Sequence, residues 1–338
     1  MVIGDFSVKA LGSVSSLEKL IPKIILDTDP GGDDIFALLW LISLVKQGLA
    51  ELVAVTTAEG NVSAEQTFAA ASKILKLGGL NDVEIGRAVA VDHATTDAAH
   101  IHGSDGMGNL SETLPEGDRT FETANYSDQM LINALTAAPG EITILAIAPF
   151  TNLAAAETKH PGILRQAKEI VLMGGAFDCA GNITAHAEFN IAYHPEAAQV
   201  VLNSRSDIVM VPLDVTRSLI FTEAMAHTIQ QANPNSAIAQ FIDALCSFMI
   251  STALAYRETQ GIRGFLIHDA ATVGYLFYPE TFRWRRATVQ IETQGVWTRG
   301  QTLIDNRHSA KLGAIAWIAT QVDPPNFFMG LIEDLKHL

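Results

Sequence analysis

The chain is predicted to adopt an α/β fold with an open, mostly parallel central sheet and helices on both faces. Two observations predict this class. Short apolar runs alternate with longer segments of helical periodicity through most of the 338 residues, and this alternation is typical of βαβ units. Polar residues follow several of the apolar runs directly, and ligands bind at the carboxyl ends of the strands in open α/β sheets. The sequence therefore predicts both a fold class and the edge of the sheet at which a site should lie.

The strand candidates are short runs rich in isoleucine, leucine and valine. Such runs are apolar without alternation, as expected for parallel strands that helices cover on both faces. In chain order they occupy residues 24–26, 52–56, 142–147, 170–173 and 208–211. The segment 288–296 is a further candidate for a late strand.

Helical patterns lie between these runs and continue beyond them. The clearest occupy residues 64–77, 126–137, 152–159 and 195–203, another begins at Ile35, and the segment 234–261 is expected to be mostly helical. No internal repeat or Pro/Gly/Ser-rich linker divides the chain, so we expect one domain over residues 22–338 after an N-terminal extension over residues 1–21. The extension lacks a basic stretch ahead of a continuous apolar core, which argues against a signal peptide.

The composition indicates a compact soluble protein and argues against several classes of partner. Hydrophobic residues make up 48% of the chain, charged residues 17%, and the formal net charge is −15. This acidity argues against nucleic acid and anionic membranes as partners, and no apolar run is expected to reach the length of a membrane span. Cys179 and Cys246 are the only cysteines, so neither a disulfide framework nor a cysteine metal site is expected. A cytoplasmic location follows as an expectation.

The segment IILDTDPGGDDIFAL at residues 24–38 carries the strongest chemical signal. Its four carboxylates, which flank a Pro-Gly-Gly turn after the first predicted strand, are Asp27, Asp29, Asp33 and Asp34. Carboxylates crowded at a strand end repel one another unless a cation or a shared proton neutralises them, and oxygen ligands suit calcium or magnesium rather than zinc. The alternative is that one aspartate caps the next helix and the others face solvent. That alternative does not account for Asp27 and Asp29, so a metal site is the favoured interpretation.

Other polar clusters recur after strand candidates. They are Glu59-Gly60-Asn61, Thr151-Asn152, Gly181-Asn182, Glu188-Phe189-Asn190 and His268-Asp269. Each has a structural alternative: Asn61 and Asn152 could be turn or cap residues, and His268 with Asp269 could cap a helix. In an extended segment Glu188 and Asn190 face the same side, which suits a polyol ligand and equally a surface edge. Taken together at strand ends, the clusters indicate a binding site.

His102 lies in a glycine-rich segment, Ile101-His102-Gly103-Ser104-Asp105-Gly106, that favours neither helix nor strand. A histidine in such a loop is either a plain exposed residue or a ligand contact, and the residues alone leave both interpretations open.

The motifs together resemble those of the calcium-dependent inosine–uridine-preferring nucleoside hydrolases. DTDPGGDD at residues 27–34 matches the family's D-x-D-P-G-x-D-D fingerprint. The match continues in family order through GN at 60–61, HGSDGMG at 102–108, FTNLA at 150–154, VLMGGAF at 171–177, AEFNIAYHPEAA at 187–198, IHDAATV at 267–273 and TRGQT at 298–302. The resemblance covers roughly residues 22–307 and implies a Rossmann-like core.

The resemblance implies one calcium ion. Its implied ligands are the carboxylates of Asp29, Asp34 and Asp269 and the backbone carbonyl of Thr151. This oxygen-only set fits the preference of calcium. Asp33 would be the general base on a calcium-bound water, and Asp27 would be a supporting carboxylate.

The resemblance also implies a set of substrate contacts. Asn61, Asn182, Glu188 and Asn190 would hold the ribose hydroxyls. His102 is a further expected contact, and Tyr256 lies where some family members place a tyrosine over the nucleobase. His268 is the candidate acid for the departing base. The sequence differs from common family members at Glu59, where a small or apolar residue usually precedes the Gly-Asn pair.

The implied activity is hydrolysis of the N-glycosidic bond of ribonucleosides to a free base and ribose, by direct water attack, in purine or pyrimidine salvage. A homodimer or homotetramer is implied by analogy alone. An aspartyl-phosphate phosphatase would need threonine at Gly31, and an EF-hand would need glutamate at Leu38. A non-catalytic nucleoside-binding protein would be expected to lack the base, yet Asp33 is present. The sequence does not indicate which nucleobase is preferred.

Overall fold

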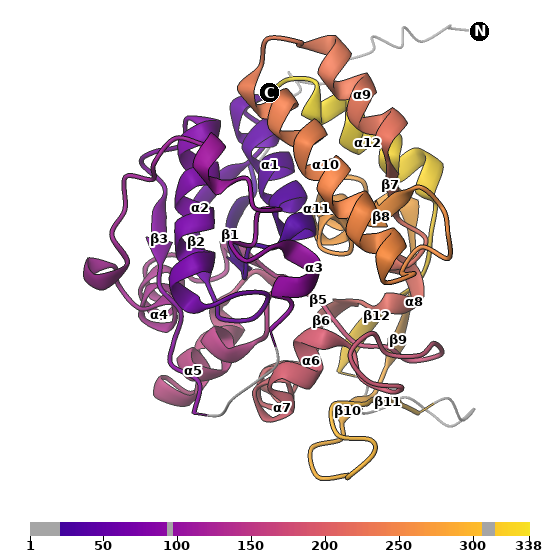
Figure 1. Ribbon diagram of the computed structural model, residues 1–338. Coiled ribbons are helices and arrows are strands. Elements are labelled where there is room, and N and C mark those ends of the chain that lie inside the picture. The colour runs from indigo at the N-terminus through magenta and orange to yellow at the C-terminus, as the bar shows by residue number, and fades with distance from the viewer. Residues whose placement is uncertain (1–20, 93–96, 306–314) are drawn as a thin grey trace, which may run out of the picture.

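A computed structural model describes residues 21–92, 97–305 and 315–338. Its central feature is an eight-stranded sheet in the order β3-β2-β1-β4-β5-β6-β12-β9 (Figure 1). These strands are β1 Lys23–Thr28, β2 Glu51–Thr57, β3 Glu84–Gly86, β4 Ile142–Ala146, β5 Glu169–Met173, β6 Ile208–Val211, β9 Phe282–Ala287 and β12 Ala316–Val322. Neighbouring strands are parallel except that β9, at one edge, runs antiparallel to β12. The predicted fold class is confirmed.

Two small sheets lie outside the central one. In one, β7 Ile220–Thr222 pairs with β8 Gly264–Leu266, and in the other β10 Val289–Ile291 pairs with β11 Thr302–Ile304, both antiparallel. The predicted N-terminal extension, residues 1–21, lies outside the described residues except for Ile21.

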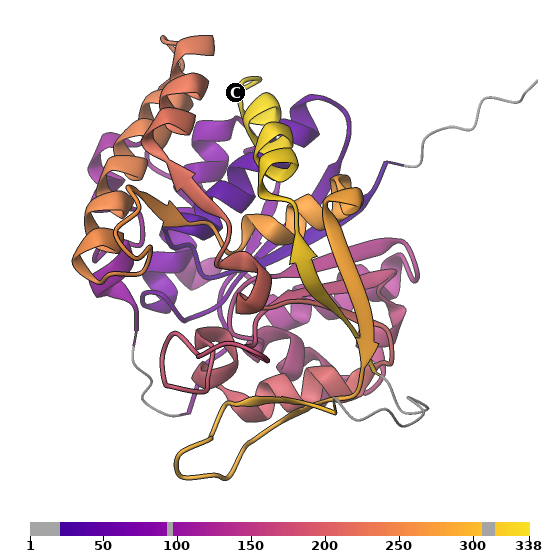
Figure 2. The same cartoon turned by 90° about the vertical axis from the view of Figure 1, so that its right-hand side faces the viewer.

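Helices cover both faces of the central sheet. The helices are α1 Gly32–Lys46, α2 Ala64–Gly78, α3 Ala99–His102, α4 Ser127–Ala137, α5 Thr151–Lys159, α6 Phe189–Tyr193, α7 Pro195–Ser204, α8 Leu213–Thr216, α9 Glu223–Ala232, α10 Ala237–Ala255, α11 Ala270–Phe277 and α12 Pro324–Leu335. Short 3-10 turns occupy Ser111–Thr113, Phe121–Thr123, Ile163–Gln166 and Pro279–Thr281. One apolar core contains buried side chains of α1, α2, α9, α10, α11 and α12. The core on the opposite face contains those of α4, α5 and α7 (Figures 1 and 2).

The first helix is buried on all sides, which fixes the position of its N-terminus. Every residue of α1 from Gly32 to Leu44 is buried, because α2, α11 and α12 pack around it. A helix that is apolar all round is a core helix rather than an amphipathic surface helix. Its first turn is therefore held at the carboxyl end of β1, where the predicted acidic site lies.

Most predicted elements exist within one or two residues of their expected bounds. Within the segment 234–261, α10 occupies Ala237–Ala255. Of the segment 288–296, only Val289–Ile291 forms a strand, and that strand pairs in a small hairpin rather than in the central sheet. Glu292 ends it, because its carboxylate accepts hydrogen bonds from the N–H groups of Gln294 and Gly295 and so closes a turn.

By length and apolar composition alone, one helix among the described residues, α10, could cross a membrane. The expectation that no segment reaches this length was therefore wrong. More than half of the apolar window of α10 is buried inside the fold, where side chains such as Ile242 and Leu245 join the larger core. The length and apolarity of α10 are thus those of a core helix.

Candidate functional site

The acidic residues of the 24–38 segment converge at the carboxyl end of β1. Asp29 lies in the connection from β1 to α1, Asp33 and Asp34 lie in the first turn of α1, and Asp269 immediately precedes α11. One carboxylate oxygen from each of Asp33, Asp34 and Asp269 lies within 4.8 Å of the other two. All of these side chains are buried. The structure therefore brings together residues that are more than 230 positions apart in the sequence.

Asn61 joins Asp29 to Asp34. Its backbone N–H donates to Oδ2 of Asp29 at 2.8 Å, and its side-chain amide donates to the Asp29 carbonyl and to Oδ2 of Asp34, both at 3.0 Å. The preceding residue, Gly60, has to be glycine because a Cβ atom there would lie 2.1 Å from Oδ2 of Asp29. The loop after β2 is thus fitted closely against the acidic residues.

Asp33 and Asp34 are adjacent in sequence but differ in their surroundings. Asp34 accepts hydrogen bonds from the Thr28 hydroxyl at 2.7 Å and from the N–H groups of Asp29 and Gly31 at 3.2 and 3.0 Å, besides the bond from Asn61. Asp33 shares a hydrogen bond with Asp269, as Asp34 also does. Asp34 is therefore fixed in position, whereas the carboxylate of Asp33 is held mainly by another carboxyl group.

Burial and mutual repulsion raise the pKa values of these carboxyl groups. Burial raises the pKa of Asp33 to about 7, and the charge of Asp34 adds to the shift. Burial and then the charge of Asp34 raise the pKa of Asp29, and burial and then the charge of Asp33 raise that of Asp269 well above its usual range. Burial also raises the pKa of Asp34, although its hydrogen bonds oppose this. The cluster therefore favours a neutralising proton or cation.

The oxygen donors present fit a hard cation. Oδ1 of Asp29 is buried and has no hydrogen-bond partner among the described residues, and the same holds for Oγ1 of Thr151. No lysine or arginine in the described ranges forms an ion pair with Asp29, Asp33, Asp34 or Asp269. An unpartnered buried carboxylate oxygen beside three further carboxyl groups is the environment that a divalent cation stabilises. The cluster could therefore hold a metal ion.

Asp27 lies behind the cluster and acts through hydrogen bonds to its neighbours. Its Oδ1 accepts from the Thr56 hydroxyl at 2.6 Å and from the Asn152 amide at 2.8 Å. Asn152 also donates to the Thr57 carbonyl at 2.9 Å. Burial raises the pKa of Asp27 to about 7. These contacts connect β1 to β2 and to the start of α5. Asn152 is the second residue of α5, whose N-cap is Phe150, so it is neither the turn residue nor the cap of the alternative interpretation.

The residues predicted to hold ribose lie along the next loops of the same edge. Asn190 is buried, and its side-chain amide donates to the carbonyls of Ile147 and Met173 at 2.9 and 3.1 Å. Asn182 is exposed, and its side-chain oxygen accepts from the N–H of Phe189 at 2.9 Å. The amide of Asn190 thereby joins the ends of β4 and β5.

Glu188 is not in the extended segment that the sequence suggested. It is the N-cap of α6, and its carboxylate accepts from the N–H groups of Asn190, Ile191 and Gly175 at 2.8, 3.1 and 3.0 Å. Burial raises its pKa, while these hydrogen bonds lower it. The same-side argument for Glu188 and Asn190 was therefore wrong, because a helix begins between them.

His268 is partly buried and contacts a residue that the sequence did not single out. Its Nδ1 lies 2.7 Å from the hydroxyl of Thr216, the last residue of α8. Burial, together with the positive charge of Arg217, lowers the pKa of His268 to about 3. The imidazole is therefore neutral at pH 7 in the ligand-free protein. Nothing in the sequence around Thr216 predicted this contact, since the two residues meet only through tertiary packing.

His102 is a buried residue at the end of a short helix, so its interpretation as an exposed loop residue was wrong. Its Nδ1 accepts from the N–H of Gly32, the first residue of α1, at 2.9 Å. Burial lowers its pKa to about 4. A Cβ atom on Gly31 would lie 2.8 Å from the same nitrogen, which explains why a glycine precedes α1.

Tyr256 and Glu59 lie at the border of this region. Tyr256 is 54% exposed and its ring meets that of His100 edge-on at 5.1 Å. Glu59 is partly buried rather than turned fully outward, and its carboxylate accepts from the hydroxyl of Tyr193 at 3.3 Å. The sequence did not predict the contact with Tyr193, which lies 134 positions further along the chain.

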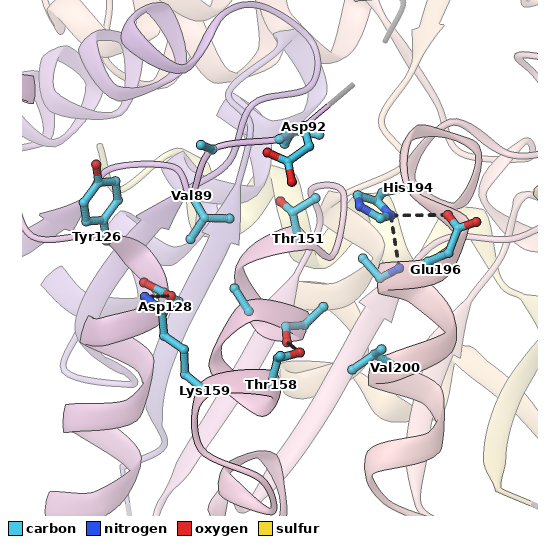
Figure 3. Close-up of a pocket in the computed structure, with 15 residues that line it drawn as sticks. Val89, Asp92, Tyr126, Asp128, Thr151, Thr158, Lys159, His194, Glu196 and Val200 are labelled. Atoms are coloured by element: carbon cyan, nitrogen blue, oxygen red, sulfur yellow. Dashed lines mark hydrogen bonds and ion pairs between the residues drawn. The ribbon is translucent and has the colours of Figure 1, made fainter. Parts of the chain in front are cut away.

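A separate cavity of about 650 Å³ opens on the face of the sheet that α4, α5 and α7 cover. Thr151 lines one end of it, beside Asp92 and His194 (Figure 3). Lys159 forms an ion pair with Asp128 on one side of the cavity. Thr151, the first residue of α5, thus lines this cavity, and its buried hydroxyl has no hydrogen-bond partner in the described ranges.

Comparison with known proteins identifies the family. The model of the inosine-uridine preferring nucleoside hydrolase family matches residues 24–329. An inosine-uridine preferring nucleoside hydrolase of Leishmania major is 31% identical over 94% of this chain and 98% of that protein. A non-specific ribonucleoside hydrolase of Klebsiella pneumoniae (strain 342) is 35% identical over 90% of this chain and 95% of that protein.

The structural comparison gives the same result. A purine-preferring ribonucleoside hydrolase from Gardnerella vaginalis superposes with a TM-score of 0.84 at 27% identity, covering 93% of this chain and 98% of that one. The family model spans the chain from β1 to α12, including the residues of the acidic cluster, and the comparisons favour an enzyme over a non-catalytic binding protein. The chain therefore belongs to the inosine-uridine preferring nucleoside hydrolase family, whose members are N-glycosidases that hydrolyse ribonucleosides.

Proposed function

We propose that this nucleoside hydrolase works with calcium held by the acidic cluster. The observation that carries the proposal is a set of buried carboxylates for which the described residues provide no lysine or arginine partner. Within the same ranges one of them, Asp29, has an oxygen without a hydrogen bond. The proposed ligands are the carboxylates of Asp29, Asp34 and Asp269 and the backbone carbonyl of Thr151. When bound, calcium would lower the pKa of water and bind the ribose hydroxyls. Oxygen donors without nearby cysteine favour calcium over zinc.

We assign different roles to the two adjacent aspartates of α1. Asp34, fixed by four hydrogen-bond donors, suits a ligand that must hold its position. Asp33 lacks these donors and lies beside Asp269, so its carboxylate is free to take a proton from the attacking water. A general base has to reach that water while the metal ligands stay in place.

Asn61, Asn182, Glu188 and Asn190 are the proposed ribose contacts. Asn61 bonds to two of the proposed ligands, so it would position the sugar relative to the cation. Asn190 and Glu188 lie at the ends of β4 and β5, the strands next to β1 on one side. Hydrogen bonds to the sugar that tighten in the transition state would stabilise the oxocarbenium-like ribosyl group.

The nucleobase is proposed to lie near His268, with His102 and Tyr256 as further contacts. Nδ1 of His268 faces the Thr216 hydroxyl at 2.7 Å, which leaves Nε2 to face the base. As the acid, the imidazole would bind a proton in the nucleoside complex and donate it from Nε2 to the departing base, becoming neutral again. Tyr256 is exposed, so it would form the outer wall of the base site. These residues do not distinguish a purine from a pyrimidine.

The remaining proposals concern the biological role, the location, the assembly and the domain organisation. Release of a free base and ribose is a salvage step, and we place the enzyme in the cytoplasm as a homodimer or homotetramer with one domain over residues 22–338. The nucleoside is its proposed partner, and neither nucleic acid nor membrane is.

A substrate panel tests the proposal directly. Inosine, uridine, cytidine, adenosine and guanosine are incubated with the purified enzyme, and released ribose and free base are quantified. We expect equimolar base and ribose from at least one nucleoside, loss of activity in excess chelator, and recovery on adding calcium. Full activity in excess chelator, or zinc found by elemental analysis of the active enzyme, would contradict the calcium assignment.

A further inference from the structure

The loop between β5 and α6 is held by the short helix α8. At the start of the loop, the N–H of Leu213 donates to the carbonyl of Gly175 at 2.9 Å. The two carboxylate oxygens of Asp214 accept from the N–H groups of Phe177 and Asp178 at 2.9 and 2.7 Å. The first residues of α8 therefore fix the path of this loop as it leaves the sheet.

Arg217, the residue after α8, holds the same loop further along. It is half-buried, and a terminal nitrogen of its guanidinium donates to the carbonyl of Gly181 at 3.0 Å. Gly181 lies in a tight turn, since a Cβ atom there would lie 2.1 Å from the carbonyl oxygen of Ala187. The N–H of the next residue, Asn182, donates to that same carbonyl at 3.2 Å. The turn is thus closed by its own backbone and attached to the end of α8 by Arg217.

The side chain of Asn182 has one end that is available to a ligand. Its Oδ1 accepts from the N–H of Phe189, the first residue of α6, at 2.9 Å. Its amide nitrogen has no hydrogen-bond partner in the part of the chain that the structure describes, and the residue is exposed. An amide nitrogen donates, and a sugar hydroxyl can accept from it. The position of this donor depends on the backbone that Arg217 holds.

Arg217 also lies close to the proposed acid. Burial and then the positive charge of Arg217 lower the pKa of His268, and the preceding residue, Thr216, places its hydroxyl 2.7 Å from Nδ1 of His268. Two successive residues at the end of α8 therefore face the proposed acid and the loop of Asn182. The hydrogen bond of Arg217 goes to the loop, so the loop is the part of the site that its removal should displace.

We propose that Arg217 is a positioning residue for the ribose, because its hydrogen bond to the carbonyl of Gly181 places the amide of Asn182 against a sugar hydroxyl. The inference rests on the proposed role of Asn182 as a ribose contact. Arginine suits this task, since its guanidinium stays charged and a charged donor forms a stronger hydrogen bond than a neutral one. A displacement of about 1 Å is enough to impair a contact that matters in the transition state.

A double-mutant cycle tests whether Arg217 acts through Asn182. Arg217→Met removes the donor and should lower kcat/KM for the best natural nucleoside about tenfold, as expected for one lost hydrogen bond to the sugar. In an Asn182→Ala background the same substitution should change kcat/KM by less than about twofold, because the contact is already absent. Arg217→Lys, which keeps a charged donor, should recover most of the loss.

Arg119→Met is the matched control. The guanidinium of Arg119 donates to the backbone carbonyl of Asn81 at 3.0 Å, ahead of the edge strand β3, whereas the acidic cluster lies at the carboxyl end of β1. This variant therefore loses the same kind of bond away from the site, and it should keep kcat/KM. Thermal unfolding of both variants shows whether either is less stable. An equal loss of kcat/KM in Arg119→Met would assign the effect to general stability and overturn the proposal.

A riboside with a p-nitrophenol leaving group separates an effect on the sugar from one on the base. Ribose is common to both substrates, so Arg217→Met should lower kcat/KM by the same factor for the natural nucleoside and for p-nitrophenyl riboside. A larger loss on the natural nucleoside would mean that Arg217 acts through His268, and this would overturn the proposal.

The cycle also separates failure of this inference from failure of the proposed ribose contact. If Asn182→Ala lowered kcat/KM and Arg217→Met lowered it by its full factor again in that background, Asn182 would remain a ribose contact but Arg217 would not position it. If Asn182→Ala left kcat/KM unchanged, the ribose contact itself would be wrong, and the role of Arg217 with it.

Discussion

At the residue scale, substitution of Asp33 and of Asp34 tests whether the first is the general base and the second a metal ligand. Asp33→Asn should retain metal and nucleoside binding while lowering kcat by several orders of magnitude, because only proton removal is lost. Asp34→Asn should weaken the metal itself, since its carboxylate is the one fixed by Thr28, Gly31 and Asn61. Steady-state kinetics with calorimetric titration of calcium measures both effects.

The two asparagine variants serve as controls for each other, because they replace the same group at neighbouring positions of one helix turn. If Asp33→Asn lost the metal while Asp34→Asn kept both metal and turnover, the two roles would have been assigned in the wrong order.

Substitution of His268 tests whether this residue protonates the departing base. His268→Ala should slow hydrolysis of natural nucleosides far more than hydrolysis of a riboside whose leaving group is p-nitrophenol, because the activated group leaves without a proton. The contact with Thr216 supports this role, since it fixes which ring nitrogen faces away from α8. The measurement is the ratio of the two kcat/KM losses.

A purely structural role for His268 predicts a different ratio. If its interaction with Thr216 only held α8 against α11, both substrates would suffer equally through lost stability. Equal losses would remove His268 from the reaction and direct attention to His102 or Tyr256.

At the element scale, the buried parallel strands could be predicted from the sequence and the edge strand could not. β1, β4 and β6 are rich in buried isoleucine, leucine and valine because helices cover both faces of the sheet. β9 has the sequence FRWRRA, and only its first and last residues, Phe282 and Ala287, are buried, because it lies at the edge of the sheet and carries charged side chains there. Its three arginines conceal the strand from any search for apolar runs, and only pairing with β12 makes it part of the sheet.

His102 provides a pH test of the contact between α3 and α1. Its pKa is lowered to about 4 by burial, against an ordinary value of 6.5. The unfolded chain therefore binds a proton at a higher pH than the folded chain does, so the stability that neutral His102 contributes is lost as pH falls from about 6.5 to about 4. The full effect is up to roughly 3 kcal/mol.

We expect His102→Gln to lose less unfolding free energy than the unmodified protein between pH 7 and pH 4.5. A glutamine carbonyl can still accept the Gly32 N–H, but it does not titrate. Urea unfolding at the two pH values, compared between the two proteins, isolates this residue from the carboxyl groups that titrate in both. Equal losses would show that the protonation of His102 is not coupled to folding.

At the scale of the whole molecule, several residues of the candidate site could be predicted from the sequence, but the contacts between them could not. The crowding of Asp27, Asp29, Asp33 and Asp34 within one short segment predicted a cation site from residues alone. That Asp269 joins this cluster could be inferred only from the family resemblance or from the fold, because no local sequence pattern connects Asp269 with β1. Likewise, the contact of Thr216 with His268 and that of Tyr193 with Glu59 join residues far apart in the sequence. Such contacts are known only from the fold.

The last prediction concerns how the cluster affects the stability of the whole fold. Buried carboxylates that repel one another oppose folding, and a cation that binds only the folded chain removes this cost and adds its own binding free energy. At pH 7.5, calcium at a hundred times its dissociation constant should stabilise the fold by about 2.7 kcal/mol, which thermal unfolding records as a higher Tm than in chelator. Asp29→Asn should lose most of this shift, because Asp29 is a proposed ligand and one of its buried oxygens has no hydrogen-bond partner among the described residues. Met329→Ser, which changes an exposed residue of α12, should keep it. A Tm that calcium leaves unchanged, or that rises equally in Asp29→Asn, would place the cation elsewhere or exclude it, and the buried carboxyl groups would then have to be neutralised by shared protons alone.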